Sequence, residues 1–273
     1  MAMGDRVCAI TGAASGIGRA LAVELATRGS DVALCDVNEE GLAETVALVE
    51  RLGRRATASV VDVSDRAQVE AFRDRVLDDH GRADAIVNNA GVAVNEQVVD
   101  LTYDDFEWIM GINFWGVVYG TKSFLPHLLE RGDGWVVNVS SVFGLISVPY
   151  QGAYNATKFA VRGFTEALRG ELHGTGVTPL CVHPGGIKTN IVRNGRWRAS
   201  AEGVTHAQAA DRFDQSLART TAEQAAVIIA DAMEARKTRV LVGPDAVAID
   251  AIARAAPVRY TDLVLLAEQR RRG

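Results

Sequence analysis

Short apolar runs alternate along the chain with longer segments in which apolar and polar residues recur at helical spacing. The short runs favour strands buried on both faces, and the longer segments favour helices that cover them. This alternation predicts an α/β fold with a doubly wound sheet of about seven parallel strands, flanked by helices on both faces. Strands are expected at residues 6–11, 31–36, 56–61, 84–88, 134–140, 177–183 and 238–242. Helices are expected near 17–28, 39–52, 65–80, 103–130, 153–173 and 221–236.

The chain has no low-complexity linker, internal repeat or step in charge, so we expect a single domain over residues 1–273. About 40 residues separate the sixth strand from the helix at 221, too many for a plain connection, and such loops are usually functional. We therefore predict a substrate loop at about 187–218 and a C-terminal extension at 244–273. Two helix starts show capping residues, Ser64 before 65–80 and Thr221 before 221–236.

A glycine-rich turn follows the first strand, where residues 11–18 read Thr-Gly-Ala-Ala-Ser-Gly-Ile-Gly. Gly12, Gly16 and Gly18 allow a tight turn and a close approach to phosphate, and the next helix offers free amides at its N-terminus. Glycines alone fit a flexible loop about as well. Their place between a strand and a helix indicates a Rossmann-like dinucleotide site.

The second strand ends at Asp36, whose carboxylate can accept hydrogen bonds from an adenosine ribose and repels a 2′-phosphate. A helix cap is its alternative role. Val37 follows, and the glycine turn carries Ala14 and Ser15 where a cation could have stood. These residues favour NAD over NADP, and Arg19 is expected to face away from the site.

Tyr154 and Lys158 stand four residues apart in a predicted helix and therefore share one face. A nearby ammonium favours the phenolate and lowers the tyrosine pKa from its usual value of about 10. Ser141 adds a hydroxyl that can hold a substrate oxygen. The three residues predict proton transfer at an alcohol or carbonyl, with Tyr154 as the base in oxidation and the acid in reduction.

Ligands of open parallel sheets bind at the carboxyl ends of the strands, and the candidate residues stand at such ends. They are Gly12, Asp36, Asp62, Asn88, Ser141 and Pro184. Asn113 lies instead inside a predicted helix, among Ile112, Phe114 and Trp115. A buried amide there is costly unless it is used, for example to tie two backbone segments together.

In this order the motifs resemble the short-chain dehydrogenases/reductases, in the subgroup with Thr-Gly-x-x-x-Gly-x-Gly and Tyr-x-x-x-Lys signatures. The resemblance covers residues 5 to about 243 and rests on Thr11 to Gly18, Asp62-Val63, Asn88-Asn89-Ala90-Gly91, Asn113, Ser141, Tyr154, Lys158 and Pro184-Gly185. It implies catalysis by Asn113, Ser141, Tyr154 and Lys158. It also implies that Asn113 kinks its helix and holds a water, and that Lys158 binds the nicotinamide ribose. The hydride chemistry would belong to the nicotinamide.

The resemblance also implies the cofactor contacts. Asp62 and Val63 would hold the adenine, residues 89–91 the adenosine ribose, and residues 184–189 the nicotinamide end. The expected cofactor-binding residues are Gly12, Ser15, Gly16, Ile17, Gly18, Asp36, Val37, Asp62, Val63, Asn89, Ala90, Gly91, Tyr154, Lys158, Pro184, Gly186, Ile187 and Thr189. No metal site is expected, because the cysteines and histidines lack metal-ligand spacing.

Apolar residues dominate the expected substrate side, which favours a small hydrophobic secondary alcohol or ketone. They are Val92, Ala93, Val142 and Phe143, beside Tyr150, Gln151 and the loop 190–215. Arg193, Arg196 and Arg198 fit a solvated loop face or a contact with a carboxylate or phosphopantetheine carrier. A carrier-linked 3-oxoacyl reductase that uses NADPH is therefore an alternative, against which Asp36 argues. A non-catalytic dinucleotide-binding sensor is another, against which the four catalytic residues argue.

Composition narrows the remaining possibilities. The net charge is −5 and the isoelectric point about 5.6, which argues against general nucleic-acid binding. No apolar run is long enough to span a membrane, and the early first strand leaves no room for a signal peptide. Cys8, Cys35 and Cys181 lie in apolar runs and are expected to be buried, reduced thiols of a cytoplasmic protein.

The C-terminal extension carries the apolar cluster Leu263-Val264-Leu265-Leu266, which must cover its own core or meet a partner. Segments 103–130 and 153–173 have apolar residues on more than one face, and the resemblance implies that these helices pair across a two-fold axis. We therefore expect a homodimer or homotetramer. A membrane-surface role for the cluster with the terminal arginines is the alternative.

Overall fold

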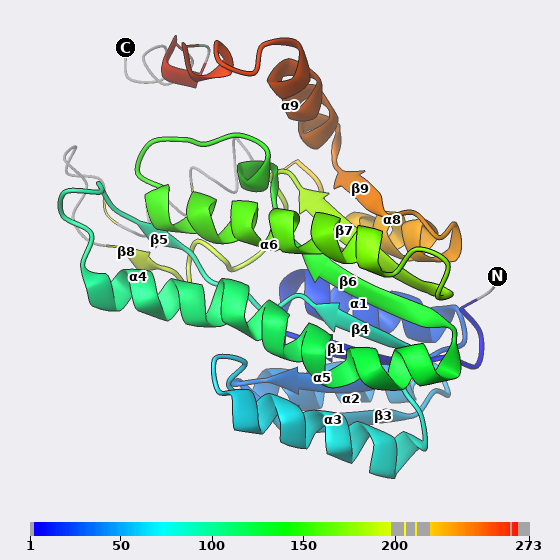
Figure 1. The fold of residues 1–273 in the computed structure, drawn as a ribbon. Coiled ribbons are helices and arrows are strands. Elements are labelled where there is room, and N and C mark those ends of the chain that lie inside the picture. The colour runs from blue at the N-terminus through cyan, green and yellow to red at the C-terminus, as the bar shows by residue number, and fades with distance from the viewer. Residues whose placement is uncertain (1–2, 198–204, 206–210, 212–218, 263, 267–273) are drawn as a thin grey trace.

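Seven parallel strands form one sheet in the order β3-β2-β1-β4-β6-β7-β9 (Figure 1). The structure is a computed structural model that describes residues 3–197, 205, 211, 219–262 and 264–266. All seven predicted strands are confirmed, and each end lies within one residue of its expected position. Their bounds are β1 (Val7–Thr11), β2 (Asp31–Asp36), β3 (Ala56–Val60), β4 (Ala85–Asn88), β6 (Gly134–Val139), β7 (Val177–Pro184) and β9 (Arg239–Val242).

Helices cover both faces of the sheet, so the fold is a single α/β domain with two apolar cores (Figure 1). On one face lie α1 (Gly16–Thr27), α2 (Glu39–Glu50) and α8 (Ala222–Glu234). On the other lie α3 (Arg66–His80), α5 (Gly116–Arg131) and α6 (Gly152–Glu171). The central strands read as almost unbroken apolar runs because both of their faces are buried.

One of the two predicted helix caps is confirmed. Thr221 and Gln224 form a reciprocal capping box at the start of α8, with hydrogen bonds of 3.0 and 3.2 Å. The expected cap at Ser64 is wrong, because Asp65 caps α3 by accepting hydrogen bonds from the amides of Ala67 and Gln68. Ser64 instead donates its hydroxyl to Asp62, at 2.7 Å.

The predicted helix 103–130 is not continuous. It consists of α4 (Tyr103–Met110), a π-helical segment η1 (Gly111–Trp115) and α5. Two further features were not expected. Strands β5 (Val94–Asn95) and β8 (Arg196–Trp197) form a separate small sheet, and a short 3-10 helix η2 (Val142–Gly144) follows β6. Two-residue strands are too short to produce an apolar period, so sequence patterning could not indicate them.

The C-terminal extension begins with helix α9 (Pro244–Ala255), which projects from the body of the domain (Figure 1). Among its residues only Ala246 is buried, while Val247 and Ile252 are exposed. Within the described part of the chain, no helix is long and apolar enough to cross a membrane. The three cysteines are free and buried, as expected, and burial raises the pKa of the Cys8 and Cys181 thiols to about 12.

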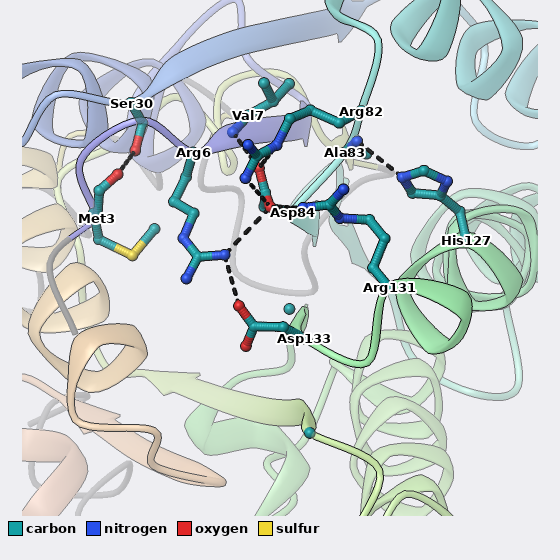
Figure 2. Close-up of polar contacts among 12 residues, drawn as sticks. Met3, Arg6, Val7, Ser30, Arg82, Ala83, Asp84, His127, Arg131 and Asp133 are labelled. Atoms are coloured by element: carbon teal, nitrogen blue, oxygen red, sulfur yellow. Dashed lines mark hydrogen bonds and ion pairs between the residues drawn. The ribbon is translucent and has the colours of Figure 1, made fainter.

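Asp84 stands just before β4, at the amino edge of the sheet, and three arginines converge on it (Figure 2). Its carboxylate is fully buried and also accepts a hydrogen bond of 2.8 Å from the Val7 amide. Burial alone would raise the pKa of this carboxyl, but the hydrogen bonds and charges lower it below its usual value. The arginines are Arg6, Arg82 and Arg131, and Arg6 also pairs with Asp133 at 2.7 Å.

We expect Asp84→Asn to lower the free energy of unfolding by about 3 kcal/mol at neutral pH, because it breaks a buried ion pair whose arginines still reach water. The lowered pKa means that the contribution of Asp84 is present above the unfolded-state value of about 3.9 and is lost as the pH falls below it. Denaturant unfolding at neutral and acidic pH measures both effects. Glu70→Gln, which disturbs an exposed ion pair with Arg66, is the matched control and should leave the midpoint unchanged. Equal loss from both variants would contradict the role of burial.

Candidate active site

The parallel sheet brings the predicted site residues to its carboxyl edge. Gly12 follows β1, Asp36 ends β2, Asp62 follows β3, Asn88 ends β4, Ser141 follows β6 and Pro184 ends β7. The strand order reverses between β1 and β4, because β2 and β3 lie on one side of β1 and the later strands on the other. Open α/β sheets bind their ligands at such a reversal.

Close packing at this reversal explains two of the three glycines. Gly12 has φ +65°, and a side chain there would lie 2.7 Å from the Ala90 Cα. A side chain on Gly18 would overlap the Gly12 carbonyl and the Asn89 amide. These glycines therefore let the first turn pack against the β4 end. Gly16, with φ +54°, instead faces Thr189, whose Cγ2 would lie 3.2 Å from an added Cβ.

The N-terminus of α1 is suited to an anion. Helices α2, α3, α4 and α8 each begin with a side chain that accepts a hydrogen bond from a first-turn amide. At α1, Ser15 makes no side-chain cap, and the first turn carries no acidic residue. Free amides and the helix dipole fit a pyrophosphate there, and Ile17 and Gly18 belong to the same first turn.

Asp36 accepts hydrogen bonds from the amides of Ala14 and Asn38, at 3.0 and 3.1 Å, so its carboxylate lies against the glycine turn. Val37 is 67% exposed beside it. The expectation that Arg19 faces away from the turn is wrong. Its guanidinium donates to the Ala14 carbonyl at 2.5 Å and pairs with Glu44 at 2.7 Å, because α2 supplies acceptors next to the turn.

The other residues expected around the adenosine include Asp62 and Val63, which follow β3, and Asn89, which follows β4. Asp62 is exposed and accepts hydrogen bonds from Ser64, while Val63 is buried against Gly116. The Asn89 side chain is committed to the protein, because it donates to the carbonyls of Thr11 and Gly12. Asn89 therefore braces the glycine turn through its side chain.

Ser141, Tyr154 and Lys158 come together beside β6. The Phe143 amide donates to the Ser141 hydroxyl oxygen at 3.1 Å, and the Ser141 side chain acts to lower the pKa of Tyr154. Lys158 lies one helical turn from Tyr154, with Nζ 5.6 Å from the tyrosine ring centroid. The Phe143 ring packs edge-on against Tyr154 at 6.1 Å. This arrangement brings a phenol, a hydroxyl and an ammonium to one place.

The expected lowering of the Tyr154 pKa by Lys158 is not present in this structure. Burial raises the pKa of Tyr154 to about 12, although the Ser141 hydrogen bond acts in the opposite direction. The Lys158 ammonium is turned toward the Val139 carbonyl, to which it donates at 3.0 Å. Burial lowers the pKa of Lys158 to about 8. Val139 is its one acceptor among the described residues, so two ammonium protons remain for a ligand.

Asn113 lies in the π-helical segment η1 and is fully buried. Its amide exchanges two hydrogen bonds with the Val92 backbone, at 2.8 and 2.9 Å, and donates a third to Thr157 at 3.2 Å. Thr157 in turn donates to the Tyr154 carbonyl at 2.8 Å. The Asn113 amide therefore ties the segment after β4, the interrupted helix and α6 together. Gly91 lies beside it, because an added Cβ would stand 3.4 Å from Asn113 and 3.5 Å from Lys158 Nζ.

The segment after β7 faces the glycine turn. Ile187 is buried and pairs with Thr220, and Thr189 contacts Gly16. Asp245, at the start of α9, accepts a hydrogen bond of 2.6 Å from the Gly186 amide. Sequence reasoning missed Asp245 because the resemblance ends near residue 243. An acid directly after Gly-Pro, in the first turn of a helix, was the available signal.

The expected substrate side lies between β4, η2 and the C-terminal extension. Val142 is buried, while Val92 and Ala93 are partly exposed. Tyr150 has φ +63°, an uncommon conformation for a bulky residue, and Gln151 donates to Asn95 at 2.8 Å. Tyr260, which sequence reasoning also missed, accepts a hydrogen bond of 3.3 Å from the Ser147 amide through its hydroxyl.

Two of the three loop arginines are paired within the protein. Arg196 forms an ion pair of 2.8 Å with Asp105 and lies 3.9 Å above the Trp108 ring. Arg193 pairs with Asp211 at 2.8 Å. Arg198 and most of the predicted substrate loop lie outside the described residues. Within the described ranges, no group of three or more potential metal ligands occurs.

Comparisons with known proteins agree with this geometry. A family model described as “short chain dehydrogenase” matches residues 6–199. The chain is 47% identical over 263 residues to “Putative oxidoreductase SadH” of Mycobacterium tuberculosis, which covers 95% of this chain and 94% of SadH. It is 37% identical over 214 residues to levodione reductase of Leifsonia aquatica, which covers 77% of this chain and 79% of that protein.

Among solved structures, a short chain dehydrogenase/reductase from Burkholderia phymatum in complex with NAD superposes with a TM-score of 0.86. The two chains are 30% identical, and the superposition covers 97% of this chain and 96% of that one. The family model matches well over half of the sequence, and SadH matches nearly all of it. The chain therefore belongs to the short-chain dehydrogenase/reductase family and is an NAD(P)-dependent oxidoreductase that acts on CH–OH donors.

Proposed function

We propose that the protein interconverts a hydrophobic secondary alcohol and its ketone, prefers NAD, and uses Tyr154 as its general acid and base. The observation that carries the proposal is the meeting of Ser141, Tyr154 and Lys158 at the sheet edge that also holds the uncapped α1 terminus. Proton-transfer groups and an anion site then lie at one end of the same sheet. Such an arrangement suits a redox reaction that pairs a dinucleotide with an alcohol.

The cofactor would be held by residues from four strand ends. The α1 amides and Gly16 would receive the pyrophosphate, Asp36 the adenosine ribose, and Asp62 and Val63 the adenine. The Lys158 ammonium would donate to the nicotinamide ribose, and Pro184, Gly186, Ile187 and Thr189 would meet the nicotinamide. When bound, the nicotinamide supplies or accepts the hydride.

The side chains of the protein handle the proton. In alcohol oxidation the Ser141 hydroxyl hydrogen-bonds the substrate oxygen, and the hydroxyl proton passes to the Tyr154 phenolate. In ketone reduction Tyr154 donates that proton back. With the Lys158 ammonium turned toward Val139, the pKa of Tyr154 is about 12 and little phenolate forms at neutral pH. In the proposed mechanism the Lys158 charge must therefore act more strongly on the phenol than it does in this structure. Asn113 and Thr157 hold the Tyr154 backbone in place.

Apolar lining supports a hydrophobic substrate. The Phe143 ring packs against Tyr154, and Val92 lies with Tyr154 against one apolar cluster. The charge of Arg196 is already balanced by Asp105. The name of one relative, levodione reductase, describes a ketone reductase. These observations favour a small alcohol or ketone over a carrier-bound acyl chain.

Three observations support NAD. Asp36 places a carboxylate beside the glycine turn, where it would repel a 2′-phosphate. Arg19, the cation next to that turn, is bound by Glu44 and by the carbonyls of Ala14 and Gly41. The related Burkholderia phymatum protein was solved with NAD.

We further propose that the protein assembles as a homodimer or homotetramer through α5 and α6. Trp115, the last residue of η1 before α5, is 47% exposed and stacks on Tyr119 of α5, and Phe159 on α6 is 37% exposed. Aromatic side chains in water on neighbouring helices favour a protein partner. Leu265 and Leu266 in the C-terminal extension are also exposed.

A cytoplasmic location stays a prediction, which rests on the three reduced thiols.

Tyr154→Phe tests the proton-transfer role. We expect kcat to fall by at least about 100-fold while NADH still binds, because only the acid–base group is lost. Steady-state kinetics and NADH fluorescence titration measure the two properties. Tyr103→Phe, at a residue 88% exposed on α4, is the matched control and should leave both unchanged. Activity within about tenfold of wild type, roughly 1.4 kcal/mol of barrier, would remove Tyr154 from this role.

Lys158 should make cofactor binding depend on pH. Its pKa of about 8 means that the ammonium, which is the form that donates to ribose hydroxyls, is lost as the pH rises through that value. NADH affinity should therefore be strongest below about pH 8 and fall above it, and Lys158→Met should bind weakly at every pH. Lys237→Met, at an exposed lysine, is the control. A wild-type affinity that stays constant across this range would contradict the ribose contact.

The double variant Asp36→Ala, Val37→Arg tests cofactor choice. Loss of the carboxylate removes repulsion and the new guanidinium adds a phosphate partner, so the ratio of kcat/KM for NADP over NAD should rise by at least about tenfold. The measurement is a dehydrogenase assay with both cofactors across alcohols and ketones. A wild-type enzyme that already favours NADP would overturn the argument from Asp36.

A further inference from the structure

Among the residues that the structure describes, Asp245 is the side chain of the C-terminal extension that hydrogen-bonds to the segment after β7. This residue lies in the first turn of α9, and its Oδ2 accepts the 2.6 Å hydrogen bond from the Gly186 amide. Gly186 stands between Pro184, which ends β7, and Thr189, which contacts the glycine turn. The carboxylate therefore acts on the backbone of the segment proposed to meet the nicotinamide.

Packing around this contact leaves no free space. A side chain on Gly185 would overlap the Asp245 carboxylate, and one on Gly243 would lie 2.6 Å from its Oδ1. Gly243 also has φ +101°, which a residue with a side chain rarely adopts. These two glycines allow the carboxylate to reach the backbone, so the contact is a built part of this edge.

Backbone hydrogen bonds hold the rest of the segment. Gly185 donates to the Val242 carbonyl at 2.9 Å. The Thr220 amide donates to the Gly186 carbonyl at 3.3 Å, and the Thr220 carbonyl accepts from the Lys188 amide at 3.0 Å. Within the described residues, Asp245 is the side chain that binds the Gly186 amide, and its Oδ1 is buried without a hydrogen-bond partner.

We propose that Asp245 is a positioning residue that fixes the Gly186–Thr189 segment against the nicotinamide end of the cofactor. The inference rests on the proposed function, which places the nicotinamide at this segment. It makes α9 part of the cofactor site although the helix is otherwise exposed. Loss of the carboxylate should let the segment relax, which would weaken binding of the nicotinamide half while the adenosine half is still held by Asp36 and the α1 turn.

Two ligands separate the halves of the cofactor. NADH carries the nicotinamide, whereas ADP-ribose lacks it and keeps the adenosine and pyrophosphate. We expect Asp245→Ala to raise the Kd for NADH by about tenfold, or about 1.4 kcal/mol, and the Kd for ADP-ribose by less than twofold. Calorimetric titration of the full chain measures both. Asp245→Asn keeps an acceptor for the Gly186 amide and should restore most of the NADH affinity.

Asp250→Asn is the matched control on the same helix, because Asp250 pairs with Arg239 and Arg254 and not with the Gly186 segment. It should leave both dissociation constants within twofold of wild type. Asp245→Ser offers the same comparison as Asp245→Ala if the alanine variant does not fold, since serine keeps a polar first turn.

Equal weakening of NADH and ADP-ribose, or no weakening of either, would overturn the positioning role. A similar loss from Asp250→Asn would also overturn it, because the effect would then belong to α9 as a whole. Failure of the wild-type protein to bind either ligand would instead contradict the proposed function. If the wild-type protein binds both ligands and Asp245→Ala binds them with the same dissociation constants, this inference is wrong and the proposed function is unaffected.

Discussion

The close contact between the glycine turn after β1 and the end of β4 is the constraint on which the rest of the site depends. Gly12 and Gly18 leave room for Asn89 and Ala90, so the two neighbouring strand ends meet without a side chain between them. Because of this contact, the N-terminus of α1 lies at the same edge of the sheet as Ser141, which follows β6, and Pro184, which ends β7. A bulkier turn would separate the anion site from the proton-transfer groups.

Sequence patterning predicted the strands well because the five inner strands are largely apolar runs buried on both faces, and the parallel order of the sheet placed the motif residues at one edge. The sequence indicated that Asn113 is a buried amide with a role in the site, but it did not indicate the π-helical segment in which Asn113 lies. That segment depends on Val92 and Thr157, which are distant in sequence and have no local signature. Asp245 and Tyr260 escaped for the same reason, since their partners are backbone amides of other segments.

The partners of the charged side chains were predicted from the sequence less well than the strands. Arg19 was expected to turn away, yet α2 offers it acceptors that only the folded chain brings close. The Lys158 ammonium similarly finds the Val139 carbonyl, and burial dominates the pKa of Tyr154. Spacing predicts which face a side chain shares, but the choice between two acceptors on that face depends on packing. The electrostatic role of a side chain is therefore harder to predict from the sequence than the fold is.

The three buried thiols give the native state a chemical signature. Only the thiolate reacts with alkylating reagents, and burial both raises the pKa of these thiols and blocks access of the reagent. Cys8 and Cys181 lie in β1 and β7, and Cys35 lies in β2, so the three report on strands across the sheet. Because unfolding restores both ionisation and access, the rate of thiol labelling records how often the sheet opens, without any engineered probe.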